Sequence, residues 1–302
     1  MEFLQDIWNQ EFMRRALIGG ALIGFTNGFL GAFIILRRMS LMADALSHSM
    51  LPGLAIGLLV FGLDRAGLFL GGILAAFFVA LGASLFSRST RLKEDTSLAI
   101  LYTFAFSVGA VLLQYVRTNV DLKHYLFGDV LGLANVDLWI AYGVSLIVIP
   151  GLILLHRPMV LTLFDPAVAR SQGVKVGLVQ LILVVASVLT MISSAQSLGV
   201  ILMLGLLVTP AATMYLVTDN LSRMMWGGGI LGMIGAIGGL LLSYKIDKLP
   251  SGAAIVIILF TIFFITFVMS PRYGLMARFR KRRHFHEESL KRWDEDVAQK
   301  ES

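Results

Sequence analysis

Two ionisable residues, Asp44 and His48, lie four positions apart in an apolar stretch of the sequence. On a helix this spacing places the carboxylate and the imidazole on one face, one turn apart. Ionisable side chains are costly inside a membrane, so such a pair predicts a functional site. One oxygen donor and one nitrogen donor suit a divalent transition metal. The pair is therefore a candidate metal site, and the alternatives are a structural Asp–His pair or a gate closed by their salt bridge.

The composition is that of a polytopic all-α membrane protein. Of the 302 residues, 57% are hydrophobic and 15% are charged, and the mean hydropathy is +0.81. These values exclude a soluble domain with a large core, and no segment alternates in the way that barrel strands do. The sequence contains no cysteine, which excludes disulfides, thiolate metal sites and cysteine nucleophiles.

Apolar segments of about 20 residues predict the helices that cross the membrane. The sequence contains nine such segments, and we expect eight to ten helices because the regions 41–62 and 176–217 are ambiguous. The nine segments are 16–36, 41–62, 66–86, 96–116, 136–155, 176–195, 198–217, 224–244 and 252–270.

Basic residues recur in alternate loops of this nine-span arrangement. The positive-inside rule then predicts a cytoplasmic C-terminus and an outer N-terminus. Arg14 and Arg15, on the outer side, are the exception. The loops on the basic side contain Arg37–Arg38, Arg88–Lys93, Arg157–Lys175, Arg223 and the chain from Arg272 onward.

Small residues recur every four positions in two of the predicted spans. Gly20, Gly24 and Gly28 lie in the first span, and Gly228 and Gly232 lie in the eighth. Such faces allow helix backbones to approach closely, so they predict tight helix packing.

A short helix is predicted in a cytoplasmic loop, over residues 165–173. Asp165 is a plausible N-cap, Pro166 suits the first helical position, and Gly173 suits the stop. The pattern predicts a helix of about two turns, and the alternative is a solvated amphipathic loop.

Two sites of helix breakage or gating are predicted from proline. Pro52-Gly53 follows the Asp44–His48 pair and is expected to break its helix, which would expose backbone carbonyls to a cavity. Thr209-Pro210 lies in a later span, where a break and ordinary packing are equally consistent with the sequence.

The chain becomes hydrophilic after Pro271, which divides it into a transmembrane domain, 1–275, and a charged cytoplasmic tail, 276–302. The tail begins with a basic cluster, Arg278–Arg283. A juxtamembrane cluster of this kind is typical of an anchor to anionic membrane lipid, and docking to another protein is the alternative. The tail is too short to suggest a nucleic-acid partner.

Five segments, in order and with suitable spacing, resemble the permeases of bacterial zinc, manganese and iron ABC importers. The resemblance covers about residues 12–275. The segments are Leu36–Gly53, Tyr125–Leu131, Phe164–Gly173, Gly199–Ala212 and the ending that runs from Leu249–Gly252 to Ser270–Gly274.

The resemblance implies a type II importer permease in the bacterial cytoplasmic (inner) membrane. Its partners would be a second permease subunit (an identical copy or a paralogue), two copies of a cytoplasmic ABC ATPase and an extracytoplasmic metal-binding protein. It implies no permanently bound cofactor, and a transported Mn, Zn or Fe ion passing Asp44 and His48. The segment from Asp165 and Pro166 through Ala169 and Arg170 to Gly173 would be the helix that couples to the ATPase.

The chain lacks the phosphate-binding sequence G-x-x-x-x-G-K-[ST], so we expect ATP hydrolysis to belong to a separate subunit. The alternatives are a secondary metal carrier, which needs no ATPase, and an intramembrane metalloenzyme. The second is disfavoured because the sequence lacks the H-E-x-x-H motif.

Overall fold

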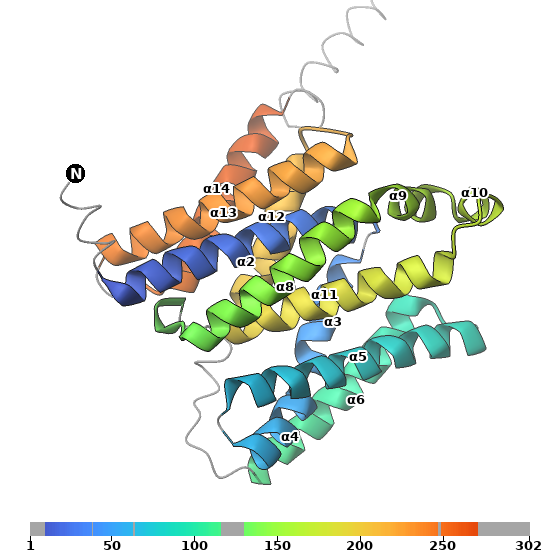
Figure 1. Cartoon of the computed structure of the whole chain (residues 1–302), viewed down its shortest axis with the longest axis horizontal. Coiled ribbons are helices and arrows are strands. Elements are labelled where there is room, and N and C mark those ends of the chain that lie inside the picture. Colours follow the sequence, from blue (N-terminus) through green and yellow to red (C-terminus); the bar gives the residue numbers. More distant parts are fainter. Residues whose placement is uncertain (1–9, 38, 63, 116–129, 247–248, 271–302) are drawn as a thin grey trace, which may run out of the picture.

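The computed structural model describes residues 10–37, 39–62, 64–115, 130–246 and 249–270 (Figure 1). The described part of the chain is built of helices and contains no β-strand. The predicted tail 276–302 and residues 125–129 of the second family-like segment lie outside the described residues. The helices are α2 Glu11–Leu36, α3 Ser40–Ser49, α4 Leu51–Phe61, α5 Arg65–Ser89, α6 Glu94–Tyr115, η1 Val130–Gly132, α8 Asn135–Leu154, α9 His156–Phe164, α10 Pro166–Ser171, α11 Val176–Leu198, α12 Val200–Tyr215, α13 Leu221–Lys245 and α14 Ser251–Met269.

The helices confirm the predicted all-α membrane architecture. Among the described residues, eight helical stretches are long and apolar enough to cross a membrane, and α3 and α4 together supply one of them, Asp44–Phe61. The predicted span 198–217 corresponds to α12, a shorter apolar helix of 16 residues. These eight stretches and α12 account for the nine predicted segments.

Helices α2 and α13 pack with their backbones in direct contact. A Cβ atom added to Gly24 would lie 2.6 Å from the carbonyl oxygen of Gly232, and one added to Gly28 would overlap the carbonyl of Gly228. Larger side chains would hold the two helices apart, because the opposing surface is backbone that cannot rotate away. The recurring glycines therefore mark tight packing, as predicted.

A second close contact joins α4 to both of its neighbours. A Cβ on Gly53 would overlap the carbonyl oxygen of Gly71 in α5, and one on Gly109 of α6 would lie 2.6 Å from the backbone nitrogen of Pro52. Helices α4–α6 thus form one group, which Figure 1 shows beside the larger group of α2, α8 and α11–α14.

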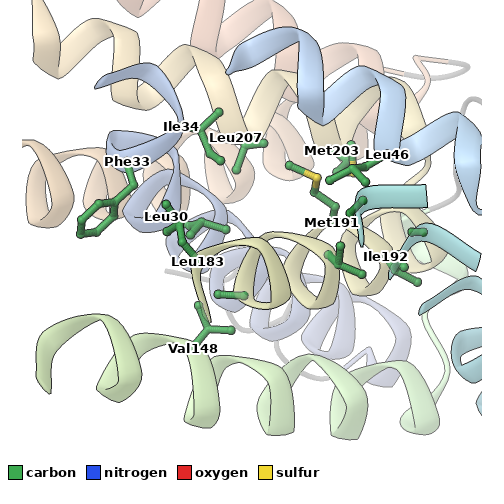
Figure 2. Close-up of a cluster of buried hydrophobic side chains, with 14 of the residues drawn as sticks. Leu30, Phe33, Ile34, Leu46, Val148, Leu183, Met191, Ile192, Met203 and Leu207 are labelled. Atoms are coloured by element: carbon green, nitrogen blue, oxygen red, sulfur yellow. The ribbon is translucent and has the colours of Figure 1, made fainter. Parts of the chain in front are cut away.

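The short helix α3 connects the two groups. It contacts α5 and α6 on one side and α11 and α12 on the other. Leu46 of α3 is buried and lies beside Met203 and Met191 in the core of the larger group (Figure 2). This anchor fixes the rotation of α3 about its own axis.

A partly buried ion pair also joins the groups, at the end opposite to α10. The guanidinium of Arg65, at the start of α5, donates to the carboxylate of Asp137, at the start of α8. Asp137 is 1% exposed, and the same carboxylate accepts from the backbone N–H of Ala134, 2.9 Å away. The side chain of Gln196 in α11 donates to the carbonyl oxygen of Arg65 at 2.7 Å. Three helices therefore meet at one polar junction.

The basic loops lie together at the other end of the bundle. The end of α2, the start of α6 and helices α9 and α10 border a single cavity, which places Arg37 at the same end of the bundle as the loop that contains Arg91 and as helix α10, which contains Arg170. Arg14 and Arg15 lie at the opposite end, where Arg15 pairs with Glu11 in the same helix. This distribution fits the predicted alternation of loops.

We expect Gly28→Ala to destabilise the protein, because the added methyl group must separate α2 from α13. Overpacking of a tight core typically costs about 1–3 kcal/mol. Thermal unfolding of the detergent-solubilised protein measures the change as a lower Tm. Gly143→Ala is the matched control, because a Cβ at Gly143 has no atom within 4 Å. An unchanged Tm for Gly28→Ala would contradict the contact.

Candidate metal-transit site

Asp44 and His48 project from α3 on the side opposite its buried anchor. Leu46 is two residues from each of them, which corresponds to about 200° of rotation on a helix. With Leu46 held in the core, the carboxylate and the imidazole face away from it. The Asp44 side chain is 49% exposed and that of His48 is 34% exposed, whereas Leu46 is 1% exposed.

The two side chains face one another across one helical turn. Nε2 of His48 lies 3.6 Å from Oδ1 of Asp44, which is ion-pair range and slightly longer than a hydrogen bond. Their neighbours Ser47 and Ser49 donate to backbone carbonyls within α3, at 2.6 Å and 2.8 Å. These hydroxyl groups are therefore committed to the helix, whereas Asp44 and His48 present partly exposed polar atoms.

Two aromatic side chains of α6 hold the imidazole of His48. The ring of Tyr102 stacks on it, with centroids 6.3 Å apart, and the ring of Phe106 meets it edge to face at 5.5 Å. Such contacts restrict the rotation of the imidazole and direct its Nε2 atom toward Asp44. The sequence alone did not identify Tyr102 and Phe106, because aromatic residues are common in apolar segments.

The helix is broken directly after the pair. Helix α3 ends at Ser49, Met50 forms the junction, and α4 begins at Leu51 with Pro52 in its first turn. Because Pro52 has no N–H group, the carbonyl of His48 lacks the donor that a continuous helix would provide. That carbonyl accepts from the N–H of Met50 instead. The buried Gly53 then allows α4 to reach the backbone of α5.

Of the two alternatives left open at Thr209-Pro210, the structure fits ordinary packing. Helix α12 runs without interruption from Val200 to Tyr215, with Pro210 inside it. The hydroxyl of Thr213 donates to the carbonyl of Thr209 at 2.7 Å, and membrane helices tolerate proline where such side chains and neighbouring helices support the backbone. The chain turns at Gly199, between α11 and α12, where φ is +88° and favours glycine.

A single chain offers few ligands for a metal. In the described part of the chain, no group of three or more His, Asp or Glu side chains is close enough to share an ion. The pair therefore supplies two donors, which suits a brief stop for an ion more than permanent binding.

The predicted short helix is present as α10. The side chain of Asp165 caps it by accepting from the backbone N–H groups of Ala167 and Val168, both at 3.0 Å. Pro166 occupies the first turn, and Gly173 ends the segment with φ of +80°. Ala169 is completely buried, whereas Arg170 is exposed. Helix α10 thus packs on the bundle through the small residue Ala169, and the face of the helix that carries Arg170 is exposed.

Sequence reasoning also missed the junction of Arg65 and Asp137. The sequence does contain a signal for this junction, because an acidic residue within an apolar span, such as Asp137, requires a partner of opposite charge, such as Arg65. Asp137 lies at the start of the predicted span 136–155, and its partner Arg65 is 72 residues away in the sequence, farther than several other basic residues.

Comparison with known proteins places these features in one family. The family model described as the ABC 3 transport family matches residues 9–270. Among curated relatives, the manganese transport system membrane protein MntC of Halalkalibacterium halodurans is 37% identical over 278 residues, covering 92% of this chain and 94% of the relative. The manganese import system permease protein ScaB of Streptococcus parasanguinis is 35% identical over 271 residues, covering 90% of this chain and 95% of the relative.

A solved structure agrees with the fold. PsaBC from Streptococcus pneumoniae, solved in complex with Fab, contains a chain that superposes with a TM-score of 0.80 at 31% identity. The match covers 90% of this chain and 96% of that chain. Since the family model spans all of the described helices, the chain belongs to the ABC 3 transport family.

Proposed function

We propose that this chain is the permease subunit of an ATP-driven importer that moves manganese across the bacterial cytoplasmic membrane. The observation that carries the proposal is its likeness, over nine-tenths of its length, to relatives named as a manganese transport system membrane protein and a manganese import system permease protein. The Asp44–His48 pair alone is compatible with manganese, zinc and iron. Family membership argues against a secondary carrier and against an intramembrane metalloenzyme.

In this proposal Asp44 and His48 contact the ion as it passes. The ion would meet a carboxylate oxygen and a deprotonated imidazole nitrogen, which are the forms that bind metals. A second permease subunit related by two-fold symmetry would double the two donors to four. The partial exposure of both side chains in one subunit supports this arrangement, because such a face must be covered or hydrated within a membrane.

The broken helix gives the site a means to change. Met50 separates α3 from α4, so α3 can tilt without moving the glycine-packed α4. A tilt of α3 would carry Asp44 and His48 together, because both lie on that helix. Pro52 and Gly53 are the proposed gating residues, and Thr209 and Pro210 take a packing role in the continuous α12.

Helix α10 is the proposed contact with a separate cytoplasmic ATPase. Its exposed Arg170 suits an acidic groove, and its capped, compact shape suits transmission of a rigid-body movement. The basic loops at this end support a cytoplasmic orientation of α10 and of the C-terminus. An extracytoplasmic metal-binding protein would deliver manganese to the opposite end. The tail 276–302 would contact anionic lipid.

The whole function is tested by uptake of radioactive manganese into proteoliposomes that contain the assembled complex. We expect uptake to require ATP, the ATPase subunit and the binding protein. Competition by zinc and iron, each added alone, measures the preference among the three metals. Uptake that continues without ATP hydrolysis would contradict the proposal.

For the site, we expect Asp44→Asn and His48→Gln each to reduce manganese uptake by about tenfold or more, a loss typical of a damaged metal shell. Asp44→Asn removes the negative charge and one carboxylate oxygen, and His48→Gln replaces the imidazole nitrogen with a weaker amide donor, while both changes keep the side chain close to its original size. Asp64→Asn is the control, because Asp64 caps α5 and asparagine caps equally well. Wild-type uptake by the double variant Asp44→Asn/His48→Gln, at equal amounts of assembled complex, would rule out the site.

For the coupling helix, we expect Arg170→Glu to abolish stimulation of ATP hydrolysis by the loaded binding protein, because it reverses the charge presented to the ATPase. Lys175→Glu makes the same change at an exposed position after the helix and should leave stimulation near the wild-type value. Equal loss of stimulated ATP hydrolysis in the two variants would show that α10 has no specific role in coupling to the ATPase. Manganese binding by the isolated permease should be the same in both.

A further inference from the structure

Helices α5 and α11 run along each other in opposite directions and meet at the end of the bundle opposite to α10, which is the outer end in the proposed orientation (Figure 1). There the guanidinium of Arg65 donates to the carboxylate of Asp137, and the side chain of Gln196 donates to the carbonyl oxygen of Arg65. One turn before Gln196, α11 contacts α5 again, since a Cβ on Gly72 would lie 3.2 Å from the Cγ2 atom of Ile192. The two helices are therefore closely packed toward the outer end.

The same two helices are separated at the α10 end. A cavity of about 720 Å³ lies between them, lined by Leu81 and Leu85 of α5 and by Gly177 and Leu181 of α11. Pro166 of α10 lines the same cavity. Helices α5 and α11 thus form a V that is closed at the ion pair and open toward α10, and the cavity provides room for the open end to close.

The hydrogen bonding at the closed end of the V is incomplete. The carboxylate of Asp137 accepts from Arg65 and from the N–H of Ala134 through Oδ2. Its Oδ1 atom and the Oε1 atom of Gln196 are buried and have no hydrogen-bond partner among the described residues. A buried acceptor of this kind has lost water without a replacement, which favours separation of the junction. The Arg65 side chain is 43% exposed, so its guanidinium can return to water when the helices part.

Helix α11 also connects this junction to α10. The N–H of Val174, just after α10, donates to the carbonyl of Ala169 at 2.9 Å, and α11 begins two residues later. The helix then runs unbroken from Val176 to Leu198, so Gln196 lies about 30 Å from its start. A movement of α10 therefore has one continuous helix along which to reach the ion pair.

We propose that Arg65, Asp137 and Gln196 form a latch, which holds the outer end closed while the cavity at the α10 end is open and which separates when that cavity closes. Helices α5 and α11 would rock about the contact between Gly72 and Ile192. The inference rests on the proposed function, in which ATP-driven movement of α10 switches the permease. The residues of the latch are positioning residues that stabilise one of two states, and they do not contact the ion.

The test measures distances between spin labels at the two ends of the V. Because the chain has no cysteine, introduced cysteines carry the only labels. Ala66→Cys with Val136→Cys is the outer pair, on α5 and α8. Ser89→Cys with Leu178→Cys is the inner pair, on α5 and α11, and all four positions are exposed. Val136→Cys with Lys245→Cys is the control pair, since both of its helices belong to the larger group. Single-cysteine variants identify the distances between subunits.

The measurement is double electron–electron resonance on the assembled complex in lipid nanodiscs, without nucleotide and then trapped with ATP and vanadate. We expect trapping to lengthen the outer distance and to shorten the inner one, with no change in the control distance. The inner change should be about two to three times larger, because along α5 Ser89 lies about 25 Å from Gly72 and Ala66 about 10 Å from it. A static brace between α5 and α8 predicts the same outer distance in both states, and that result would overturn the proposal.

Variants of Arg65 test whether the ion pair holds the outer end closed. Arg65→Gln removes the charge and should lengthen the outer distance without nucleotide. Arg65→Lys keeps the charge and should retain the wild-type distance. Asp64→Asn is the control at the neighbouring position, because asparagine also caps α5. An outer distance in Arg65→Gln equal to that of the wild type would overturn the latch.

A wedge in the cavity tests the connection between the two ends. A Cβ on Gly177 has no atom within 4 Å, so Gly177→Leu adds a side chain to the cavity lining without displacing protein atoms. We expect this variant to keep the short outer distance after trapping and to lose most of its manganese uptake. Gly143→Leu is the matched control, since Gly143 has equal space and does not line the cavity. Normal lengthening of the outer distance in Gly177→Leu would overturn the coupling of the two ends.

Failure of the latch is distinguishable from failure of the proposed function. Uptake of manganese that requires ATP, with an unchanged outer distance in the trapped complex, would overturn the latch and leave the proposed function standing. Absence of ATP-dependent uptake by the wild-type complex would overturn the proposed function. The distances of Arg65→Gln and Arg65→Lys without nucleotide would still decide whether the ion pair holds the outer end closed.

Discussion

The structure depends on backbone contact between α2 and α13. At Gly24 and Gly28, facing Gly232 and Gly228, the two helices are separated by less than the thickness of a side chain. Lipid surrounds the bundle and is as apolar as leucine, so burial of apolar surface alone cannot drive the helices together. The attraction between the two helices comes instead from the van der Waals contacts that small residues allow between closely packed backbones. The rest of the larger group assembles around this pair, because α12 contacts both helices and α8 packs on α2.

That rigid group provides the surface on which the functional helix is seated. Leu46 of α3 enters a core formed with α11 and α12, and Tyr102 and Phe106 of α6 restrain His48 from the other side. A helix of ten residues has too little surface to be fixed by one contact. It is held here between two groups that are themselves tightly packed. The direction in which the Asp44 and His48 side chains point thus depends on the packing of α2 against α13, and so on glycines outside α3.

The sequence predicted the features that depend on neighbouring residues. The cap at Asp165, the proline at 166 and the stop at Gly173 lie within nine positions of one another, and α10 has the predicted bounds. The prediction that Asp44 and His48 share one face of a helix likewise needs only their four-residue spacing and the helical repeat. The sequence left a break and ordinary packing equally open at Pro210, and packing decided the outcome there, because a buried proline in a well-supported helix need not interrupt it. The contacts of His48 with α6, and the ion pair of Arg65 with Asp137, depend on how distant helices meet, which no local pattern encodes.

The ion pair of Arg65 and Asp137 also bears on the order in which the protein is made. Synthesis proceeds from the N-terminus, so Arg65 enters the membrane well before Asp137 exists. A long arginine side chain at a helix end can keep its guanidinium among the lipid headgroups until a partner arrives. Aspartate is too short to do this, and Asp137 is 1% exposed once the chain is folded. With the two residues exchanged, the same pair would form in the folded protein, but a carboxylate without a partner would have to be inserted first. The order of the charges therefore suits the biosynthesis of the protein as well as its final structure.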